Sequence, residues 1–411
     1  MKTMLPWESR RLTDLAEYIN GYAFAPEDWG VEGLPIIRIQ QLKNPHAPTD
    51  FYAGKLPEKN IINDGDLIFS WSASLFLRIW THGKGALNQH LFKVVEKTGV
   101  DRAFLKAFIE FYLPELTKAS HGSTMQHITR KELDKLTALF PIDVAEQKNI
   151  VAIICLLDQA IEQTEAIIAK QQSIKTGLMQ DLLTKGIDEN GSIRSEATHE
   201  FKDSPLGRIP VEWDAKTISD SAEICNNLRK PLSAQVRENM KGGYPYYGPT
   251  GIFDYINEYR VDGKYVLIGE DGDHFLKFDR QEMTILVNGQ FNVNNHAHLL
   301  QGKNGVLTEW LHFYFMHRDI TYFLTRQGAG RYKLNKATLL VLPLAFPNSN
   351  AEQLRILDAI RSFRGNYAAY QLQRDKFKTL KNGLMHDLLT GKVRVTNIPI
   401  LTPESSCPPL N

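Results

Sequence analysis

The sequence of 411 residues is 43% hydrophobic and 23% charged, which excludes a fibrous or disordered chain and allows two or more buried cores. Lysine and arginine total 48 against 47 aspartate and glutamate, so the net charge of +1 gives no overall attraction to nucleic acid, and any anion site must be local. The three cysteines, Cys155, Cys225 and Cys407, are too far apart for a close-spaced metal cluster. No secretion signal or membrane-length apolar run is visible, so we expect a cytoplasmic protein.

The first 141 residues predict an α+β globule. Short β-rich runs occur at 34–40, 66–71 and 90–95, bounded by turn-forming residues. A helical segment follows near 102–113, with its aromatic and aliphatic residues on one face. These runs are too short and too mixed for an all-α or all-β domain.

The stretch 145–184 contains no proline and predicts one long helix. Its apolar residues recur alternately at steps of four and three, the spacing of a coiled-coil seam. A helix of 40 residues is about 60 Å long at about 1.5 Å per residue, too long to bury its stripe within one globule. We therefore favour a coiled coil over two separate amphipathic core helices. Seven of the ten seam positions are apolar: Ile150, Ile154, Leu157, Ile161, Thr164, Ile168, Gln171, Lys175, Leu178 and Leu182.

A polar stretch with several glycines and prolines follows at 185–213 and predicts a linker. It leads to a second α+β globule, 213–346, with strands expected at 265–268 and 283–287 and a helix near 307–315. A second long helix and a proline-rich tail complete the sequence.

The second long helix repeats the first without a gap, 206 residues later (351 − 145). Repeats of this kind indicate tandem structural units, and helices related by a two-fold axis across their seam run antiparallel. Between residues 14 and 88 the register slips, so the globules have diverged where the helices have not. The matches at 206 include Trp7 with Trp213, Asn88 with Asn294, His90 with His296, Gly122 with Gly328, and Phe140 with Phe346.

Three motifs resemble one family. The two LMxDLLT helix ends (178–184 and 384–390), the two AEQ helix starts and the linker HEFKDSPLGRIPVEW (199–213) are similar to the specificity subunit of type I restriction-modification enzymes. The resemblance covers essentially the whole chain. It implies two target-recognition domains, each reading one half of a split DNA sequence, and two helices that form an antiparallel coiled coil and hold two methyltransferase subunits. It says nothing about which bases are read.

The predicted fold class is α+β: two tandem α+β target-recognition domains separated by two long helices packed as an antiparallel coiled coil, with a pseudo-twofold internal repeat. The expected bounds are 1–142 for the first recognition domain, 143–187 for the central helix, 188–205 for the linker, 206–346 for the second recognition domain, 347–393 for the distal helix and 394–411 for the C-terminal tail.

Two loops at matching positions are the main candidates for DNA contact. Loop 325–336 is basic and contains no acid, whereas loop 119–130 is rich in hydroxyl and imidazole groups. Arginine can bind guanine in bidentate fashion, and glutamine can bind adenine. The plainer alternative is an ordinary solvated loop. The predicted contacts are Ser123, Thr124, Gln126, His127 and Arg130 in the first copy and Arg326, Arg331, Tyr332, Lys333 and Lys336 in the second.

Three residues of the first globule are further candidates. Trp71 lies in the loop after the strand ending at Phe69, and that loop is loosely matched by the acidic turn 269–273. Arg38 and Gln40 should face one way on a strand and are weaker candidates.

The matched His90 and His296 are more simply structural hydrogen-bonding residues than ligands. The acids Glu270, Asp271 and Asp273 resemble a metal trio, but acids in a glycine-rich turn are usually solvated; they can also accept hydrogen bonds from cytosine amino groups.

Catalytic motifs are missing from the sequence. It has no GxxxxGK[ST] phosphate-binding loop and no NPPY or DPPY signature of amino-group DNA methyltransferases. We therefore expect a non-catalytic chain. The resemblance implies that it binds double-stranded DNA together with two methyltransferase subunits and with restriction and translocase subunits. AdoMet, ATP and Mg²⁺ are expected on those partners and no cofactor on this chain. A stand-alone coiled-coil scaffold or DNA-binding regulator is the alternative.

Overall fold

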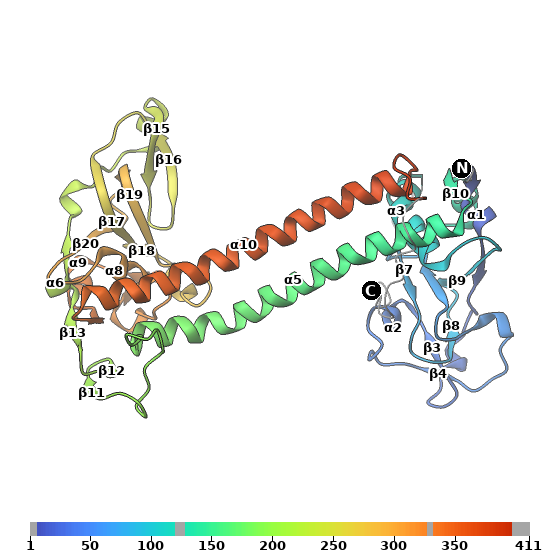
Figure 1. Ribbon diagram of the computed structural model, residues 1–411, viewed down its shortest axis with the longest axis horizontal. Helices are drawn as coiled ribbons and strands as arrows, with labels where there is room; N and C mark the ends of the chain where they lie inside the picture. Colours follow the sequence, from blue (N-terminus) through green and yellow to red (C-terminus); the bar gives the residue numbers. More distant parts are fainter. Residues whose placement is uncertain (1–5, 120–127, 327–331, 397–411) are drawn as a thin grey trace. The chain divides into compact units, whose positions relative to one another are not determined.

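The computed structural model describes residues 6–119, 128–326 and 332–396 (Figure 1). The chain divides into two compact units: unit 1 comprises Met1–Ile167 with Tyr370–Asn411, and unit 2 comprises Ile168–Ala369. Each unit holds one globule and part of both long helices. The units therefore cut the chain at points other than the expected domain bounds, which stay predictions.

The globule of unit 1 contains two four-stranded sheets and a two-stranded one. The strand orders are β2-β9-β6-β7, β4-β3-β8-β5 and β1-β10. The strands are β1 Trp7–Arg11, β2 Ala16–Asn20, β3 Leu34–Ile37, β4 Phe51–Tyr52, β5 Ile61–Ile62, β6 Leu67–Ser70, β7 Phe76–Ile79, β8 Gly85–Leu87, β9 Leu91–Glu96 and β10 Thr137–Pro141; the helices are α1 Leu12–Leu15, α2 Ile39–Lys43, α3 Arg102–Ala119 and α4 Arg130–Lys135.

The globule of unit 2 is built on a six-stranded sheet of order β14-β20-β17-β19-β15-β16. A two-stranded pair, β13-β23, a hairpin, β11-β12, and a small sheet, β18-β22-β21, complete it. The strands are β11 Phe201–Ser204, β12 Gly207–Pro210, β13 Trp213–Thr217, β14 Ala222–Ile224, β15 Lys241–Tyr247, β16 Ile252–Ile256, β17 Val261–Gly269, β18 Asp271–Gly272, β19 Thr284–Val293, β20 Ala297–Gly302, β21 Thr325–Arg326, β22 Tyr332–Lys333 and β23 Pro343–Pro347; the helices are α6 Ile218–Ser221, α7 Ala234–Glu238, α8 Thr308–Phe315 and α9 Lys336–Val341.

The element starts confirm the internal repeat. Strand β1 and β13, helix α3 and α8, helix α4 and α9, and strand β10 and β23 each begin 206 residues apart. The antiparallel pairing of β1 with β10 likewise recurs between β13 and β23. The two globules therefore share one α+β frame, and the segment between β2 and β9 carries their differences.

The two long helices are α5 Val144–Thr184 and α10 Asn350–Leu389. Each of the ten predicted seam positions is buried or half-buried in α5, and so is its counterpart in α10. Within unit 1, Lys381 pairs with Asp158 at 2.6 Å and Lys378 with Glu165 at 2.7 Å. A residue later in α5 thus pairs with a residue earlier in α10, so the two helices are antiparallel in this region (Figure 1).

Each globule buries the start of the helix that follows it together with the end of the other helix. In unit 1, Ile150 and Ile154 of α5 share a core with Leu388 and Leu389 of α10. In unit 2, the shared core joins Ile356, Leu357 and Ile360 of α10 with Met179, Leu182 and Leu183 of α5. Each LMxDLLT helix end is therefore a core element of a globule. The end of α5 joins the globule that follows it in the chain, whereas the end of α10 joins the globule of unit 1, which is distant in sequence.

A polar node closes each of these junctions. In unit 2, Trp213 Nε1 donates to Glu352 Oε1 at 2.9 Å, and Arg194 pairs with the same carboxylate. Gly186, at φ +67°, passes directly beside them, because a Cβ there would lie 2.6 Å from the Trp213 ring. The segment after α5 is therefore tied to the start of α10.

Unit 1 has the corresponding group of polar contacts, but here the glutamate lies on α5 and the arginine follows α10. Trp7 Nε1 donates to Glu146 at 3.2 Å, and Arg394 donates to Glu146 through Nε and Nη2, both at 2.7 Å. Burial raises the pKa of Glu146, but the hydrogen bonds from Arg394 and Trp7 outweigh burial and hold that pKa below its usual range.

One expected strand is corrected by the fold. The strand expected at 34–40 ends at Ile37, and Ile39 already begins the short helix α2. The linker is ordered in part: it contains the β11–β12 hairpin and the buried Arg194. Within the described residues, no helix combines the length and the apolar character needed to cross a membrane.

Candidate nucleic-acid interface

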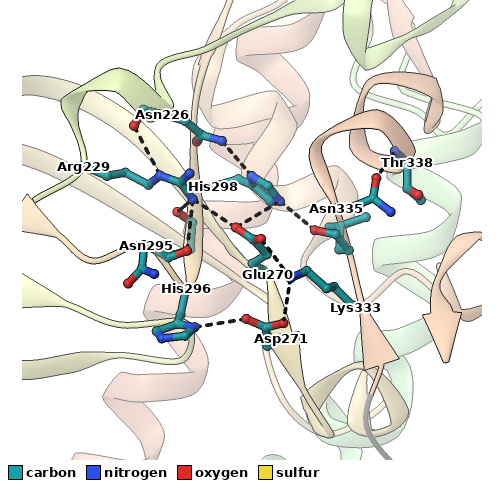
Figure 2. Close-up of polar contacts among 12 residues, drawn as sticks. Asn226, Arg229, Glu270, Asp271, Asn295, His296, His298, Lys333, Asn335 and Thr338 are labelled. Carbon is teal, nitrogen blue, oxygen red and sulfur yellow. Dashed lines mark hydrogen bonds and ion pairs between the residues drawn. The ribbon is translucent and has the colours of Figure 1, made fainter. Parts of the chain in front are cut away.

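In unit 2, three segments meet where β17 ends (Figure 2). Glu270 N donates to His296 O at 2.7 Å, and Leu334 N donates to Glu270 O at 2.8 Å. The next residue, Asp271, pairs with Lys333 in the small sheet. The basic loop predicted from the sequence therefore begins and ends in a hairpin, β21–β22 (Thr325–Arg326 and Tyr332–Lys333), whose base lies against the end of β17.

Glu270 is the hub of the polar contacts at this base. Its carboxylate accepts from Arg229 Nη1 at 3.0 Å on one side and lies 3.5 Å from Lys333 Nζ on the other (Figure 2). Arg229 is itself fixed, because Nη1 also donates to Asn295 O at 3.1 Å and Nε donates to Asn226 O at 3.2 Å. Two cations from separate segments thus meet at one carboxylate.

Asp271 forms the outer part of the same network. Its Oδ2 lies 3.0 Å from His296 Nδ1, and its Oδ1 lies 3.8 Å from Lys333 Nζ. The side chains of His296 and Asp271 are 54% and 38% exposed, against 18% for Glu270. Glu270 is therefore an internal contact, whereas Asp271 and His296 face solvent.

His298 supports the base from within the sheet. Asn226 Nδ2 donates to His298 Nδ1 at 2.9 Å, because Asn226 Oδ1 already accepts from Leu299 N at 3.1 Å. His298 Nε2 then carries the proton and donates to Leu334 O at 2.7 Å. Burial lowers the pKa of His298, so the ring is neutral and acts as a structural hydrogen-bonding residue.

Unit 1 builds the corresponding edge with different side chains. Ser70 pairs with Leu91 and Gly269 pairs with Ala297, so Trp71 stands where Glu270 stands in unit 2. Ile128 N donates to Trp71 O at 3.0 Å, as Leu334 N does to Glu270 O. The Trp71 ring packs 5.5 Å from Phe92 and 6.0 Å from His90, centroid to centroid. The backbone frame is shared, but the side chains at the edge are aromatic rather than charged.

Comparison with known proteins identifies the family of this chain. The family model described as "Type I restriction modification DNA specificity domain" matches residues 4–171 and 210–373 of this chain. The chain belongs to this family.

Relatives and solved structures agree with the assignment. The putative type I restriction enzyme specificity subunit S.HindORF215P of Haemophilus influenzae is 36% identical over 162 residues, 39% of this chain and 40% of that relative. The MjaVIII specificity subunit of Methanocaldococcus jannaschii is 24% identical over 95% of this chain and 94% of its own length.

The fold is similar to that of the type I restriction-modification S subunit from M. genitalium, with a TM-score of 0.54, 14% identity and coverage of 94% of this chain and 97% of that one. The fold is also similar to that of the HsdS subunit of Thermoanaerobacter tengcongensis, with a TM-score of 0.52, 15% identity and coverage of 94% of this chain and 97% of that one. The family model and the curated relatives together make this chain a specificity subunit, a non-catalytic component with DNA target-recognition domains.

The predicted contacts of this specificity subunit are only partly covered by the structure. Ser123, Thr124, Gln126, His127 and Arg331 lie outside the described residues. Arg326 is exposed on β21, Lys336 is exposed at the start of α9, and Tyr332 is half-buried on β22. Their contact with DNA stays a prediction.

Two of the predicted basic residues have partners inside the specificity subunit. Lys333 is shared between Glu270 and Asp271, and the Arg130 guanidinium donates to the backbone oxygen of Tyr18 on β2. In the base of the β21–β22 hairpin, the charges of Arg229 and Lys333 balance those of Glu270 and Asp271. The hairpin base therefore does not attract phosphate through net charge.

The expectation that Arg38 and Gln40 face one way on a strand is wrong. Arg38 N donates to Gln41 Oε1 at 3.1 Å, and this contact starts helix α2 immediately after Ile37. Arg38 then pairs with Asp50 at 2.5 Å and lies over the Trp29 ring, whereas Gln40 is exposed on the helix. The two side chains do not form one reading surface.

The acids of the turn contact neighbouring basic side chains. Lys277 pairs with Asp273 at 2.7 Å, while Glu270 and Asp271 contact Arg229, Lys333 and His296. In the part of the chain that the structure describes, no group of three or more histidine, cysteine or acidic side chains is arranged to hold a metal ion.

A buried histidine makes unit 2 sensitive to acid. His312 Nδ1 lies 3.0 Å from Thr284 Oγ1 in the core, and burial lowers the pKa of His312 from 6.5 to about 4. As pH falls from 6.5 to about 4, the unfolded chain takes up a proton that the folded unit does not, so stability present above pH 6.5 is lost. At about 1.4 kcal/mol per pH unit, the loss is about 3 kcal/mol.

Urea unfolding of unit 2 at pH 7 and at pH 4.5 measures this loss. The His312→Gln variant keeps a polar partner for Thr284 but has no titrating ring, so its stability should depend less on pH than that of the parent chain. The same pH dependence in both proteins would contradict the assignment to His312.

Proposed function

We propose that each globule of this specificity subunit reads one half of a bipartite, asymmetric target in double-stranded DNA. The main support is a contrast between the backbone and the side chains of the two globules. Several elements begin 206 residues apart and the backbone hydrogen bond at the edge is the same, whereas the edge carries Trp71 in one globule and Glu270 with Asp271 in the other. A shared frame presents two reading surfaces to the symmetric backbone of DNA, and different side chains on it read different bases. The halves of the target should therefore differ in sequence.

The contacts proposed for the second half-site are Arg326, Arg331, Tyr332, Lys333 and Lys336, and those for the first are Ser123, Thr124, Gln126, His127, Arg130 and Trp71. Arg38 and Gln40 stay weaker candidates for the first half-site, because they do not share a strand and Arg38 is paired with Asp50. Phosphate contacts from the basic members fix the register of the protein on the duplex, and base-edge contacts give the sequence preference.

We further propose that the long helices dock two methyltransferase subunits, one at each LMxDLLT end. Gly177 and Gly383 occupy matching exposed positions in α5 and α10, and nothing in the described chain lies within 4 Å of a Cβ built on either. Glycine in mid-helix costs about 1 kcal/mol relative to alanine, so the fold of this chain gives no reason to keep it twice. Close approach of another chain to the helix backbone does give a reason.

The residues around each glycine repeat as well. Ile174 and Leu380, one turn before, are 48% and 49% exposed, although both are large and apolar. Together these residues form one face of each helix, at steps of three and four. The matched face comprises Lys170, Ser173, Ile174, Gly177 and Asp181 on α5 and Lys376, Thr379, Leu380, Gly383 and Asp387 on α10. Two identical partner subunits would bind these two faces in the same way.

Restriction and translocase subunits would join the assembly for cleavage. AdoMet, ATP and Mg²⁺ would be bound by the partners, and the complex would act in the cytoplasm, where the buried Cys155 and Cys225 would stay reduced; neither forms a disulfide in the described structure.

Methylome sequencing tests the proposal. The chain is expressed with its neighbouring methyltransferase gene in a host that lacks other methyltransferases, and methylated adenines are mapped. The expected result is one interrupted, asymmetric motif, together with a stable complex of the two proteins. A monomeric chain without new methylation would instead favour a scaffold or a DNA-binding regulator.

A further inference from the structure

The charged network at the base of the β21–β22 hairpin is not required by the backbone frame. In unit 1, Ile128 N donates to Trp71 O at 3.0 Å without any acid at that position, and the same bond in unit 2 joins Leu334 to Glu270. The frame therefore closes equally well around an aromatic or an acidic residue. The backbone hydrogen bond at this edge therefore does not require the Glu270 carboxylate.

The geometry indicates what the carboxylate does at this edge. Arg229 holds one side of the carboxylate at 3.0 Å and is locked by two backbone oxygens, so Glu270 is a fixed point. Lys333, at 3.5 Å from the other side, belongs to β22, next to Tyr332. Its ammonium is also 3.8 Å from Asp271. Glu270 thus fixes the direction of a flexible lysine and of the strand that carries it.

We propose that Glu270 is a positioning residue for recognition of the second half-site. It holds Lys333, and with it β22 and Tyr332, in the orientation that meets the bases, and it touches no DNA itself. This inference rests on the proposed function, because it assigns to unit 2 one of the two half-sites. The first half-site depends on no such charge, since its reading edge is held by Trp71.

The same contacts predict a second effect on Lys333. While its charge is shared by two carboxylates, Lys333 is restrained from binding any phosphate that comes within reach. Without Glu270, the ammonium is free to pair with phosphates of any sequence. Loss of Glu270 should therefore weaken discrimination at the second half-site and, at the same time, strengthen non-specific binding. A residue that only stabilised the fold would weaken both.

The test uses the full chain assembled with its methyltransferase subunits and duplexes that carry the target identified by methylome sequencing. For Glu270→Gln, a mismatch in the second half-site should be discriminated about tenfold less than in the parent complex. Mismatches in the first half-site should cost as much as before. On a duplex without the target, affinity should rise and the slope of log K against log salt should steepen by about one phosphate contact.

Glu309→Gln is the matched control. Glu309 is a comparably buried acid of the same unit with two cationic partners, Lys264 and Arg361, but it lies on α8, away from the hairpin. Its variant should keep discrimination at both half-sites. The double variant Glu270→Gln with Lys333→Gln should lose the added non-specific affinity without regaining discrimination.

The outcomes separate the possible failures. Equal loss of discrimination in the Glu270 and Glu309 variants, or none in either, would overturn the role of Glu270. If Glu270→Gln does not assemble, Lys333→Gln with Glu270 intact should still reduce discrimination at the second half-site only. Absence of sequence preference in the parent complex would instead count against the proposed function.

Discussion

Replacement of Glu352 by alanine is expected to remove about 3–5 kcal/mol from the free energy of unfolding of unit 2. The Arg194 and Glu352 side chains are only 7% and 5% exposed, so the variant leaves a guanidinium buried without its carboxylate. Trp213 also loses its acceptor at 2.9 Å. Native-state hydrogen exchange of β13 and of the first turns of α10, followed by mass spectrometry, measures the loss.

The matching substitution in unit 1 is the control. Arg394 is 25% exposed, so water can solvate it when Glu146 is replaced by alanine, and the loss there should be about 1–3 kcal/mol. Exchange should rise in β1 and the start of α5 only. Equal losses in the two units, or a loss below about 1 kcal/mol for Glu352→Ala, would show that burial of the arginine does not set the cost.

The second large effect is expected from substitutions on the exposed face of the long helices. Arginine at both Gly177 and Gly383 should abolish copurification with the methyltransferase subunits, because a long side chain prevents the close approach that we propose for a partner. The chain itself should fold at least as well as before, since nothing in its described structure lies near either position and glycine is the poorer helix former. Size-exclusion chromatography of the coexpressed proteins and urea unfolding of the chain measure the two effects.

Arginine at Ala169 and Asp375 provides the control for added charge. Both residues are exposed and stand 206 residues apart on the two helices, eight residues before the glycines and about 80° around the helix. That variant should copurify with the methyltransferase normally. If it also fails, or if the glycine variants still assemble, the methyltransferase does not dock on this face.

The repeat and the helices were predictable because their signals are local and occur twice. The coiled-coil seam follows from spacing alone, and its positions are buried or half-buried in both helices. The predicted strands of unit 2 were nevertheless too short. Gly263 faces Gly289 across β17 and β19, so residues that usually interrupt strands lie inside a nine- and a ten-residue strand.

Contacts between residues distant in the chain could not be predicted from the sequence. Trp213 and Glu352 were visible as members of the repeat, but Arg194 and Arg394 were not, because they stand 200 rather than 206 residues apart. The partners of Glu270 come from separate segments and have no counterpart beside Trp71, so no periodicity could have revealed them. The prediction that Arg38 lies on a strand was wrong for a local reason. The capping contact between Arg38 and Gln41 begins a helix where the strand was expected to continue.

Unit 2 is one continuous stretch of chain, whereas unit 1 needs residues from both ends of the polypeptide. Leu388 and Leu389 complete its core, and Arg394 neutralises its buried Glu146. During synthesis the globule that leaves the ribosome first therefore has part of its apolar interior uncovered until residues 388–395 have been translated. The globule of unit 2 can complete its fold as soon as its own continuous segment has been translated. The two globules are therefore expected to complete their folding in the reverse of their order in the sequence.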